Sequence, residues 1–175
     1  MSSRGVLGVL LTGTIGAGKS SLAVELGELL ARRHLPAAIV DLDWLGWFEP
    51  PAESGLTVDE LIATNLEAVW PNFRDAGAHF VVLTRAIRSA EQVARYRRAL
   101  EGVPLRIVRV TASPETIETR LRARDQGATL AEHLDESVEF ARTLDALAVE
   151  DFRISTDGRA PEAAALELLH RLEWG

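Results

Sequence analysis

Short apolar runs alternate with longer amphipathic segments along the whole chain. Five runs have the length and unbroken hydrophobicity of strands that are buried on both faces of a parallel sheet. They span residues 6–11, 37–40, 80–83, 105–110 and 151–155. Because helical patterns separate these runs, we expect an α/β fold in which helices cover both faces of the sheet and the crossovers are right-handed.

The segments between the apolar runs carry helical spacing and helix start signals. Leucines at intervals of three and four predict a first helix over 18–33. Three further starts are marked by a capping box or by an N-cap before proline, namely Thr57 with Glu60, Ser89 with Gln92, and Ser113 before Pro114. The helices that complete the pattern are expected over 57–75, 89–100, from 113 onward, 131–148 after a polar break at 126–129, and 161–172.

Composition limits the classes of partner. The chain of 175 residues is 47% hydrophobic and 26% charged, which is typical of one globular domain spanning 1–175. A net charge of −7 disfavours long nucleic acid, whose binding depends on a basic face. No segment approaches the roughly 18 apolar residues of a membrane span. The chain has no cysteine, which excludes disulfides and thiolate metal sites and fits a cytoplasmic location.

The first apolar run leads into a phosphate-binding loop. Its residues are Gly13, Thr14, Ile15, Gly16, Ala17, Gly18, Lys19 and Ser20. Glycines allow a tight turn whose amides face phosphate oxygens, and the helix N-terminus behind them, with Ser21, adds positive charge. In this pattern the lysine reaches the β- and γ-phosphates and the serine hydroxyl ligates Mg²⁺. A purely structural glycine-rich turn is the alternative, but the position between strand and helix favours binding of ATP or GTP.

Acidic residues follow the second apolar run. Asp41 and Asp43 are two apart, so in an extended segment both lie on the same side. One carboxylate can help to hold Mg²⁺ while the other takes a proton from an attacking hydroxyl. Alternatively, the pair ends a strand and caps a turn. The third run ends in Arg85 rather than in the acid that many nucleotide-hydrolysing P-loop proteins carry there.

Four segments together resemble the small P-loop kinases, a group that includes adenylylsulfate, gluconate, shikimate and nucleotide kinases and chloramphenicol phosphotransferases. The segments are GTIGAGKSS, VDLDW, VTASPETIETRLRARD and STDGRAPEAA. The resemblance implies a three-layer α/β/α fold, a five-stranded sheet in the order 2-3-1-4-5, and a helical lid at about 120–135. It also implies that the γ-phosphate of ATP is transferred to a small acceptor bound at about 44–75, with Asp43 or Asp41 as the base.

Arginines at two places fit this resemblance. Arg120 and Arg124 share a helix face and are similar to lid residues that neutralise charge during transfer, whereas Arg122 is expected to face water. A solvated basic face is the alternative. Arg85 and Arg88 follow the third strand at the edge where open α/β sheets bind ligands, and could bind an anionic acceptor.

The aromatic residues and the last loop complete the candidate site. Trp44 and Trp47 lie in a loop beside Asp43 and are candidates for an acceptor pocket, whereas Trp70 and Phe73 are expected in the core. Asp157, Gly158 and Arg159 follow the fifth strand, where the family's loop lies against the nucleobase, although a simple turn explains them as well.

Together these features predict a Mg-ATP-dependent kinase that phosphorylates a hydroxyl of a small molecule, most like adenylylsulfate kinase. The predicted cofactors are ATP and Mg²⁺, and the metal ligands are Ser20 and Asp41. Two alternatives remain: a nucleoside or nucleotide kinase, and a nucleotide-dependent switch that hydrolyses slowly.

Overall fold

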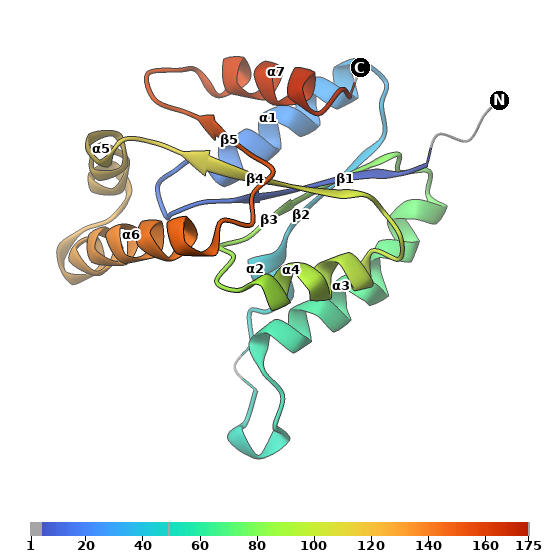
Figure 1. Cartoon of the computed structure of the whole chain (residues 1–175), viewed down its shortest axis with the longest axis horizontal. Coiled ribbons are helices and arrows are strands. Elements are labelled where there is room, and N and C mark those ends of the chain that lie inside the picture. The colour runs from blue at the N-terminus through green and yellow to red at the C-terminus, as the bar shows by residue number, and fades with distance from the viewer. Residues whose placement is uncertain (1–4, 49, 175) are drawn as a thin grey trace.

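The computed structural model describes residues 5–48 and 50–174. Its centre is a parallel five-stranded sheet in the order β2-β3-β1-β4-β5, as predicted (Figure 1). The strands are β1 (Leu7–Thr12), β2 (Ala37–Asp41), β3 (Phe80–Thr84), β4 (Leu105–Thr111) and β5 (Phe152–Ser155). In register, Leu11 of β1 lies beside Thr84 of β3, and Asp41 of β2 lies on the other side of Thr84.

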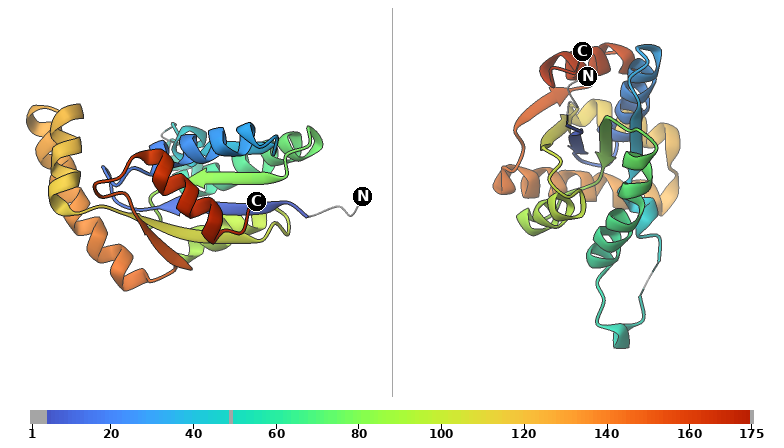
Figure 2. Two further views of the ribbon diagram at one scale, coloured as in Figure 1. Left: turned by 90° about the horizontal axis from the view of Figure 1, so that it is seen from above. Right: turned by 90° about the vertical axis from the view of Figure 1, so that its right-hand side faces the viewer.

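Two apolar layers cover the sheet because strand side chains alternate between its faces. Val9 and Leu11 pack on one side with α1 (Lys19–Arg32) and α7 (Pro161–Arg171). Leu10 packs on the other side with α3 (Val58–Asp75) and α4 (Ala90–Ala99). The result is the three-layer arrangement that the sequence predicts (Figures 1 and 2).

The predicted helix starts are confirmed. Thr57 with Glu60, and Ser89 with Gln92, form complete capping boxes at the starts of α3 and α4. The side chain of Ser113 accepts a hydrogen bond from the amide of Thr116 at the start of α5 (Pro114–Arg124). These caps satisfy amide groups that have no partner within the helix.

Two elements differ from the expectation. A short helix, α2 (Leu42–Leu45), follows β2 directly. The 3₁₀ helix η1 (Ala52–Ser54), between α2 and α3 in the chain, projects from the body (Figure 1). The predicted polar break at 126–129 is wrong, because α6 (Gly127–Leu147) begins at Gly127. Only Asp125 and Gln126 separate α5 from α6, so the two helices form one hairpin that stands beyond the carboxyl end of the sheet (Figure 2, left).

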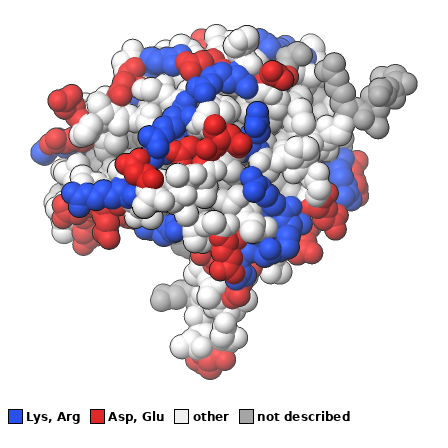
Figure 3. Space-filling view, viewed as in Figure 1, with Lys and Arg blue, Asp and Glu red and all other residues white. Residues whose placement is uncertain are grey.

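Surface charge and helix composition bear on the partner predictions. On the face drawn in Figure 3, basic and acidic side chains are interspersed. No described helix combines the length and the apolar character that a bilayer crossing needs.

Candidate functional site

The loop between β1 and α1 is shaped by glycines that no other residue could replace without strain. Gly13 has φ 150°, and a Cβ there would overlap the carbonyl oxygen of Val110. Gly18 has φ 95°, in the left-handed region, immediately before the first turn of α1. The exposed Ser20 and Ser21 then lie in that first turn, where the amides and the helix dipole favour an anion.

Lys19 folds back over the loop. Its ammonium group donates hydrogen bonds to the carbonyl oxygens of Gly13, at 2.8 Å, and Thr14, at 2.9 Å. Burial lowers the pKa of Lys19 to about 8, although the carboxylates of Asp43 and Asp41 act in the opposite direction. The lysine is therefore a poorly hydrated cation, which is suited to gain from a nearby phosphate.

Arg120 of α5 contacts the same loop from the other side. Its guanidinium donates to the carbonyl oxygen of Gly16 at 3.1 Å, and to the hydroxyl and carbonyl oxygens of Thr156 at 2.9 and 3.0 Å. Thr156 in turn donates its hydroxyl to the carbonyl oxygen of Ala17 at 2.9 Å. Arg120 thus joins α5, the phosphate-binding loop and the segment after β5.

A cavity of about 290 Å³ lies beside this junction, lined by Gly18, Ser21, Leu22, Arg120, Thr156, Arg159, Pro161 and Ala164. Arg159 also pairs with Glu167 at 2.5 Å. Asp157 and Gly158 are not among the lining residues, and the carboxylate of Asp157 instead accepts from the amide of Ser113 at 2.7 Å. Of the three predicted residues in this loop, only Arg159 reaches the cavity.

The two acids after β2 are arranged differently from the expectation. Asp41 is the last residue of β2, and its side chain accepts a hydrogen bond from the amide of Asp43 at 3.0 Å. The chain turns into α2 at this point, so the prediction that both carboxylates share one side of an extended segment is wrong. Asp41 caps the short helix, and Asp43 lies in its first turn.

Lys19 and Asp43 meet at a second cavity of about 320 Å³, which we call the acceptor cavity. Its lining residues are Ile15, Lys19, Asp43, Arg85, Ala86, Arg88, Glu136 and Phe140. The structure therefore brings together the phosphate-binding loop, the end of β2, both arginines that follow β3, and α6. The loop lysine and the candidate base share one space.

Each arginine of the acceptor cavity is held by acids. Arg85 pairs with Asp43 through one nitrogen and with Asp59 through the other, the latter at 2.9 Å. Arg88 pairs with Glu136 at 2.5 Å and lies over the ring of Phe140, 4.8 Å from its centroid. The desolvated Arg85 has a raised pKa because Tyr96, Asp43 and Asp59 together outweigh its burial.

Sequence reasoning missed Asp59, Glu136 and Phe140. Glu136 and Phe140 are four apart on a helix and share a face, but nothing local shows that this face meets Arg88. Both lie beyond the predicted lid at about 120–135. Asp59 was visible only as an acid in the first turn of α3, where such residues stabilise the helix anyway.

The other arginines of α5 do not contact the loop. Arg122 pairs with Glu118 at 2.6 Å on the exposed side of the helix, as expected for a residue that faces water. Arg124, predicted to act with Arg120, pairs with Asp125 at 2.8 Å and lies 3.3 Å from a ring nitrogen of His133. In this structure Arg124 ties the α5–α6 turn together.

The aromatic residues divide between core and surface. Trp70 is 1% exposed, as predicted, but Phe73 is 39% exposed, so its placement in the core was wrong. Trp44 and Trp47 are 69% and 77% exposed and stack on each other with ring centroids 4.9 Å apart. Neither lines the acceptor cavity, although Trp44 adjoins Asp43 in the chain.

The predicted ligands for a divalent cation offer oxygen atoms only. Within residues 5–48 and 50–174, no group of three or more His, Asp or Glu side chains is placed to hold a metal alone. Mg²⁺ fits such a site, because it takes one or two protein oxygens and completes its shell with phosphate oxygens and water. Of the two predicted ligands, Ser20 is exposed in the first turn of α1, and one carboxylate oxygen of Asp41 accepts the hydrogen bond from the Asp43 amide.

Comparison with solved structures shows the fold of small P-loop kinases. The APS kinase of Mycobacterium tuberculosis, solved with AMPPNP and APS, is 22% identical with a TM-score of 0.61, over 96% of this chain and 98% of that one. The shikimate kinase of Bacteroides thetaiotaomicron is 19% identical with a TM-score of 0.62, over 95% of this chain and 98% of that one. A gluconokinase of Sinorhizobium meliloti is 22% identical with a TM-score of 0.60, over 97% of this chain and 94% of that one.

A search of curated proteins finds no match to this chain. Residues 9–142 match a protein-family model. They run from β1 into α6 and include the phosphate-binding loop, Arg85, Arg88 and Arg120. Since this is well over half of the chain, the protein belongs to the family described as the AAA domain.

Proposed function

We propose that the protein is an ATP- and Mg²⁺-dependent kinase that transfers the γ-phosphate to a hydroxyl of a small acceptor. The observation that carries this proposal is the shared cavity of Lys19 and Asp43. A donor phosphate held by the loop and an acceptor hydroxyl beside Asp43 would meet within one space of about 320 Å³. The kinases among the structural neighbours support the same reaction class.

The donor side uses the loop, Lys19 and Arg120. The loop and Lys19 hold the β- and γ-phosphates, and the cavity beside Arg120 and Thr156 takes the base or ribose. Ser20 and Asp41 would hold Mg²⁺, which would neutralise charge on the phosphates. Arg120 stabilises the charge that develops during transfer, and Arg124 assists when the α5–α6 hairpin closes.

The acceptor side uses Asp43. Its carboxylate takes the proton of the acceptor hydroxyl, whose oxygen forms a bond to the γ-phosphorus while the bond to the β–γ bridging oxygen breaks and ADP leaves. Arg85 holds Asp43 in place. The lining carries three basic side chains against two acids, so we favour an acceptor with an anionic group, as adenylylsulfate has. A nucleoside or nucleotide is the alternative acceptor.

An acceptor screen with γ-labelled ATP tests this proposal. The screen covers adenylylsulfate, sugar acids, hydroxylated antibiotics, nucleosides and nucleotides, and we expect one class to yield a labelled product. Asp43→Asn should lower that rate by about a hundredfold or more, as removal of a general base does. Asp75→Asn is the matched control, because Asp75 is exposed and pairs with Arg74 far from both cavities.

Lys19→Ala should abolish both ATP binding and transfer. If no acceptor is labelled while ATP is slowly hydrolysed, the protein is a nucleotide-dependent switch instead, and the kinase proposal is wrong. If transfer survives Asp43→Asn at full rate, the assignment of the base is wrong.

A further inference from the structure

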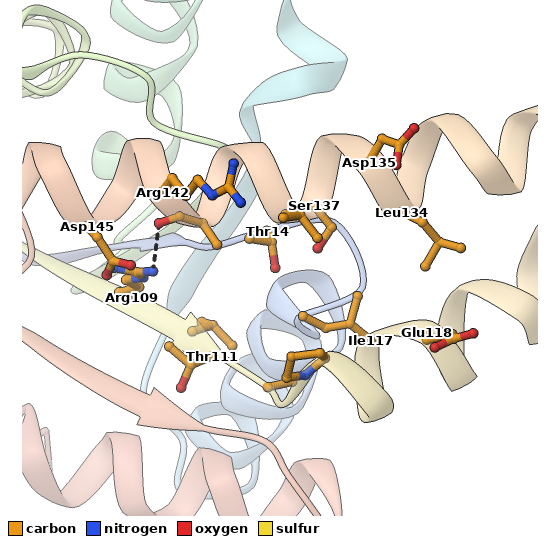
Figure 4. A pocket seen from close by; sticks show the side chains of 15 residues that line it. Thr14, Arg109, Thr111, Ile117, Glu118, Leu134, Asp135, Ser137, Arg142 and Asp145 are labelled. Atoms are coloured by element: carbon orange, nitrogen blue, oxygen red, sulfur yellow. Dashed lines mark hydrogen bonds and ion pairs between the residues drawn. The ribbon is translucent and has the colours of Figure 1, made fainter.

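A third cavity lies behind α6, outside the donor and acceptor cavities (Figure 4). It encloses about 540 Å³ between the end of β4, the start of α5 and the middle of α6. Its walls are mainly apolar, with Val110, Ala112, Pro114, Ile117, Leu134, Val138 and Ala141. This volume is within the range of sites that bind small molecules.

Two hydroxyl groups face this cavity without protein partners. Thr14 and Ser137 are only 7% and 5% exposed, and Figure 4 shows their side chains pointing into the space between α6 and β4. Neither hydroxyl forms a hydrogen bond with another residue in 5–48 or 50–174. Each hydroxyl opens into the cavity rather than being sealed in the core, so a ligand there can supply the hydrogen bond that the protein does not.

The charges around the cavity are already paired or exposed. Arg109 donates to Asp145 at 2.6 Å and to the carbonyl oxygen of Ala141 at 3.2 Å, which closes the inner end of the cavity. Glu118 pairs with Arg122. The remaining charged lining residues, Asp135 and Arg142, are exposed. Asp135 and Arg142 are opposite in charge and already hydrated, so a charged ligand would lose its own hydration here for little net gain from them.

We infer that this cavity binds an uncharged, ring-sized molecule that is mostly apolar and carries a hydroxyl group for Thr14 and Ser137. The inference does not require the proposed kinase reaction, although Thr14 also belongs to the phosphate-binding loop. A ligand in this cavity would also affect the acceptor cavity, because α6 separates the two. Ser137 and Ala141 face this one, whereas Glu136 and Phe140 face the acceptor cavity. A bound ligand therefore holds α6, and with it one wall of the acceptor cavity, in place.

Three indole compounds with the same ring and different charges test the inference on the full chain. They are tryptophol, which is neutral, tryptamine, which is cationic, and indole-3-acetate, which is anionic. In calorimetric titrations we expect tryptophol to bind with a dissociation constant below about 1 mM, given its size. Both charged compounds should bind at least about fivefold more weakly, because they lose hydration without a partner.

Variants locate the binding. Ala141→Leu fills part of the cavity and should weaken tryptophol binding by about tenfold, and Ser137→Ala removes one hydroxyl and should weaken it by about threefold. Ala146→Leu makes the same change at an exposed position of α6 that lines neither cavity, and should leave binding unchanged. Unfolding curves show whether each variant is folded. If Ala141→Leu is not folded, the smaller change Ser137→Ala still tests the location of binding.

The inference is overturned if tryptophol does not bind, if a charged analogue binds equally well, or if the folded cavity variants bind tryptophol as the unmodified protein does.

Discussion

Arg85 lies 2.9 Å from the carboxylate of Asp59, on α3, while its other terminal nitrogen pairs with Asp43. Asp59 also accepts a hydrogen bond from Gln92 at 2.8 Å, and Gln92 caps α4. The candidate base is thus connected through one guanidinium to two helices. Since Arg85 is largely buried, its orientation depends on both acids.

We expect Asp59→Asn to lower phosphoryl transfer through Arg85. The amide cannot balance the charge of Arg85, so the guanidinium shifts toward Asp43 and displaces it from the acceptor hydroxyl. A small misplacement of this kind costs about tenfold in rate. Because Asp59 is 37% exposed but Arg85 only 14%, loss of this charge should lower the free energy of unfolding by about 1–2 kcal/mol. Initial rates and urea unfolding measure the two effects.

Glu60→Gln is the matched control for Asp59→Asn. Glu60 is the next residue on α3 and pairs with Arg95 rather than Arg85, and glutamine can still complete the capping box with Thr57. Its rate should equal that of the unmodified protein. Equal rates for both variants would show that Arg85 does not position the base.

Lys19 gives nucleotide binding a predictable pH dependence. In the free protein the pKa of Lys19 is lowered to about 8 because the group is buried. Phosphates favour the charged lysine, so above pH 8 binding must take up a proton. ATP affinity should therefore fall as pH rises through about 8, by up to about tenfold per pH unit. Calorimetric titrations between pH 7 and 9.5 measure this slope, and buffers of different ionisation enthalpy report the proton uptake.

Lys19→Arg distinguishes the titration of Lys19 from the titration of other groups, including those of ATP. The guanidinium stays charged throughout this range, so the variant should show a nearly constant ATP affinity, even if that affinity is lower. A flat profile for the unmodified protein, or the same slope in the variant, would contradict the assignment to Lys19.

The phosphate-binding loop could be predicted from sequence because its parts are local. The loop, its lysine and the first turn of α1 are consecutive residues, and the flanking strand is a continuous apolar run. The acceptor side depends on tertiary packing. Glu136 and Phe140 come from a helix far along the chain, and their position depends on the α5–α6 hairpin.

Three local errors have physical causes as well. The four residues of α2 are too few to show helical periodicity, so Asp41 was taken as part of an extended segment when it is an N-cap. The polar residues after Gln126 suggested a break, but α6 begins there and presents them to solvent. Phe73 follows Pro71 near the end of α3, where the helix has passed the core that Trp70 fills.

Arg120 is expected to matter for both nucleotide binding and the shape of the loop. Arg120→Ala removes the hydrogen bonds to Gly16 and Thr156, which should lower the free energy of unfolding by about 1–2 kcal/mol and ATP affinity by about tenfold. Arg122→Ala is the control, because Arg122 lies on the same helix but pairs only with Glu118 on the surface. Urea unfolding and ATP titration should separate the two variants, and equal behaviour would contradict the role of Arg120.

The tryptophans allow a test of the α2–α3 region. Trp70 is fully enclosed by the core beneath α3, so Trp70→Ala should lower the free energy of unfolding by about 3–5 kcal/mol. Trp44→Ala should change it by about 0.5 kcal/mol or less, because the exposed ring contacts mainly Trp47. Urea unfolding followed by far-UV circular dichroism measures both without relying on tryptophan emission.

Quenching of fluorescence checks the same placement independently. Acrylamide should quench a large, accessible part of the emission in the unmodified protein, because Trp44 and Trp47 are exposed. The doubly substituted Trp44→Ala and Trp47→Ala protein should lose most of that part and keep the shielded emission of Trp70 and Trp174. A large destabilisation by Trp44→Ala, or unchanged quenching in the double variant, would show that the pair is covered in solution and that the surface beside Asp43 is occupied.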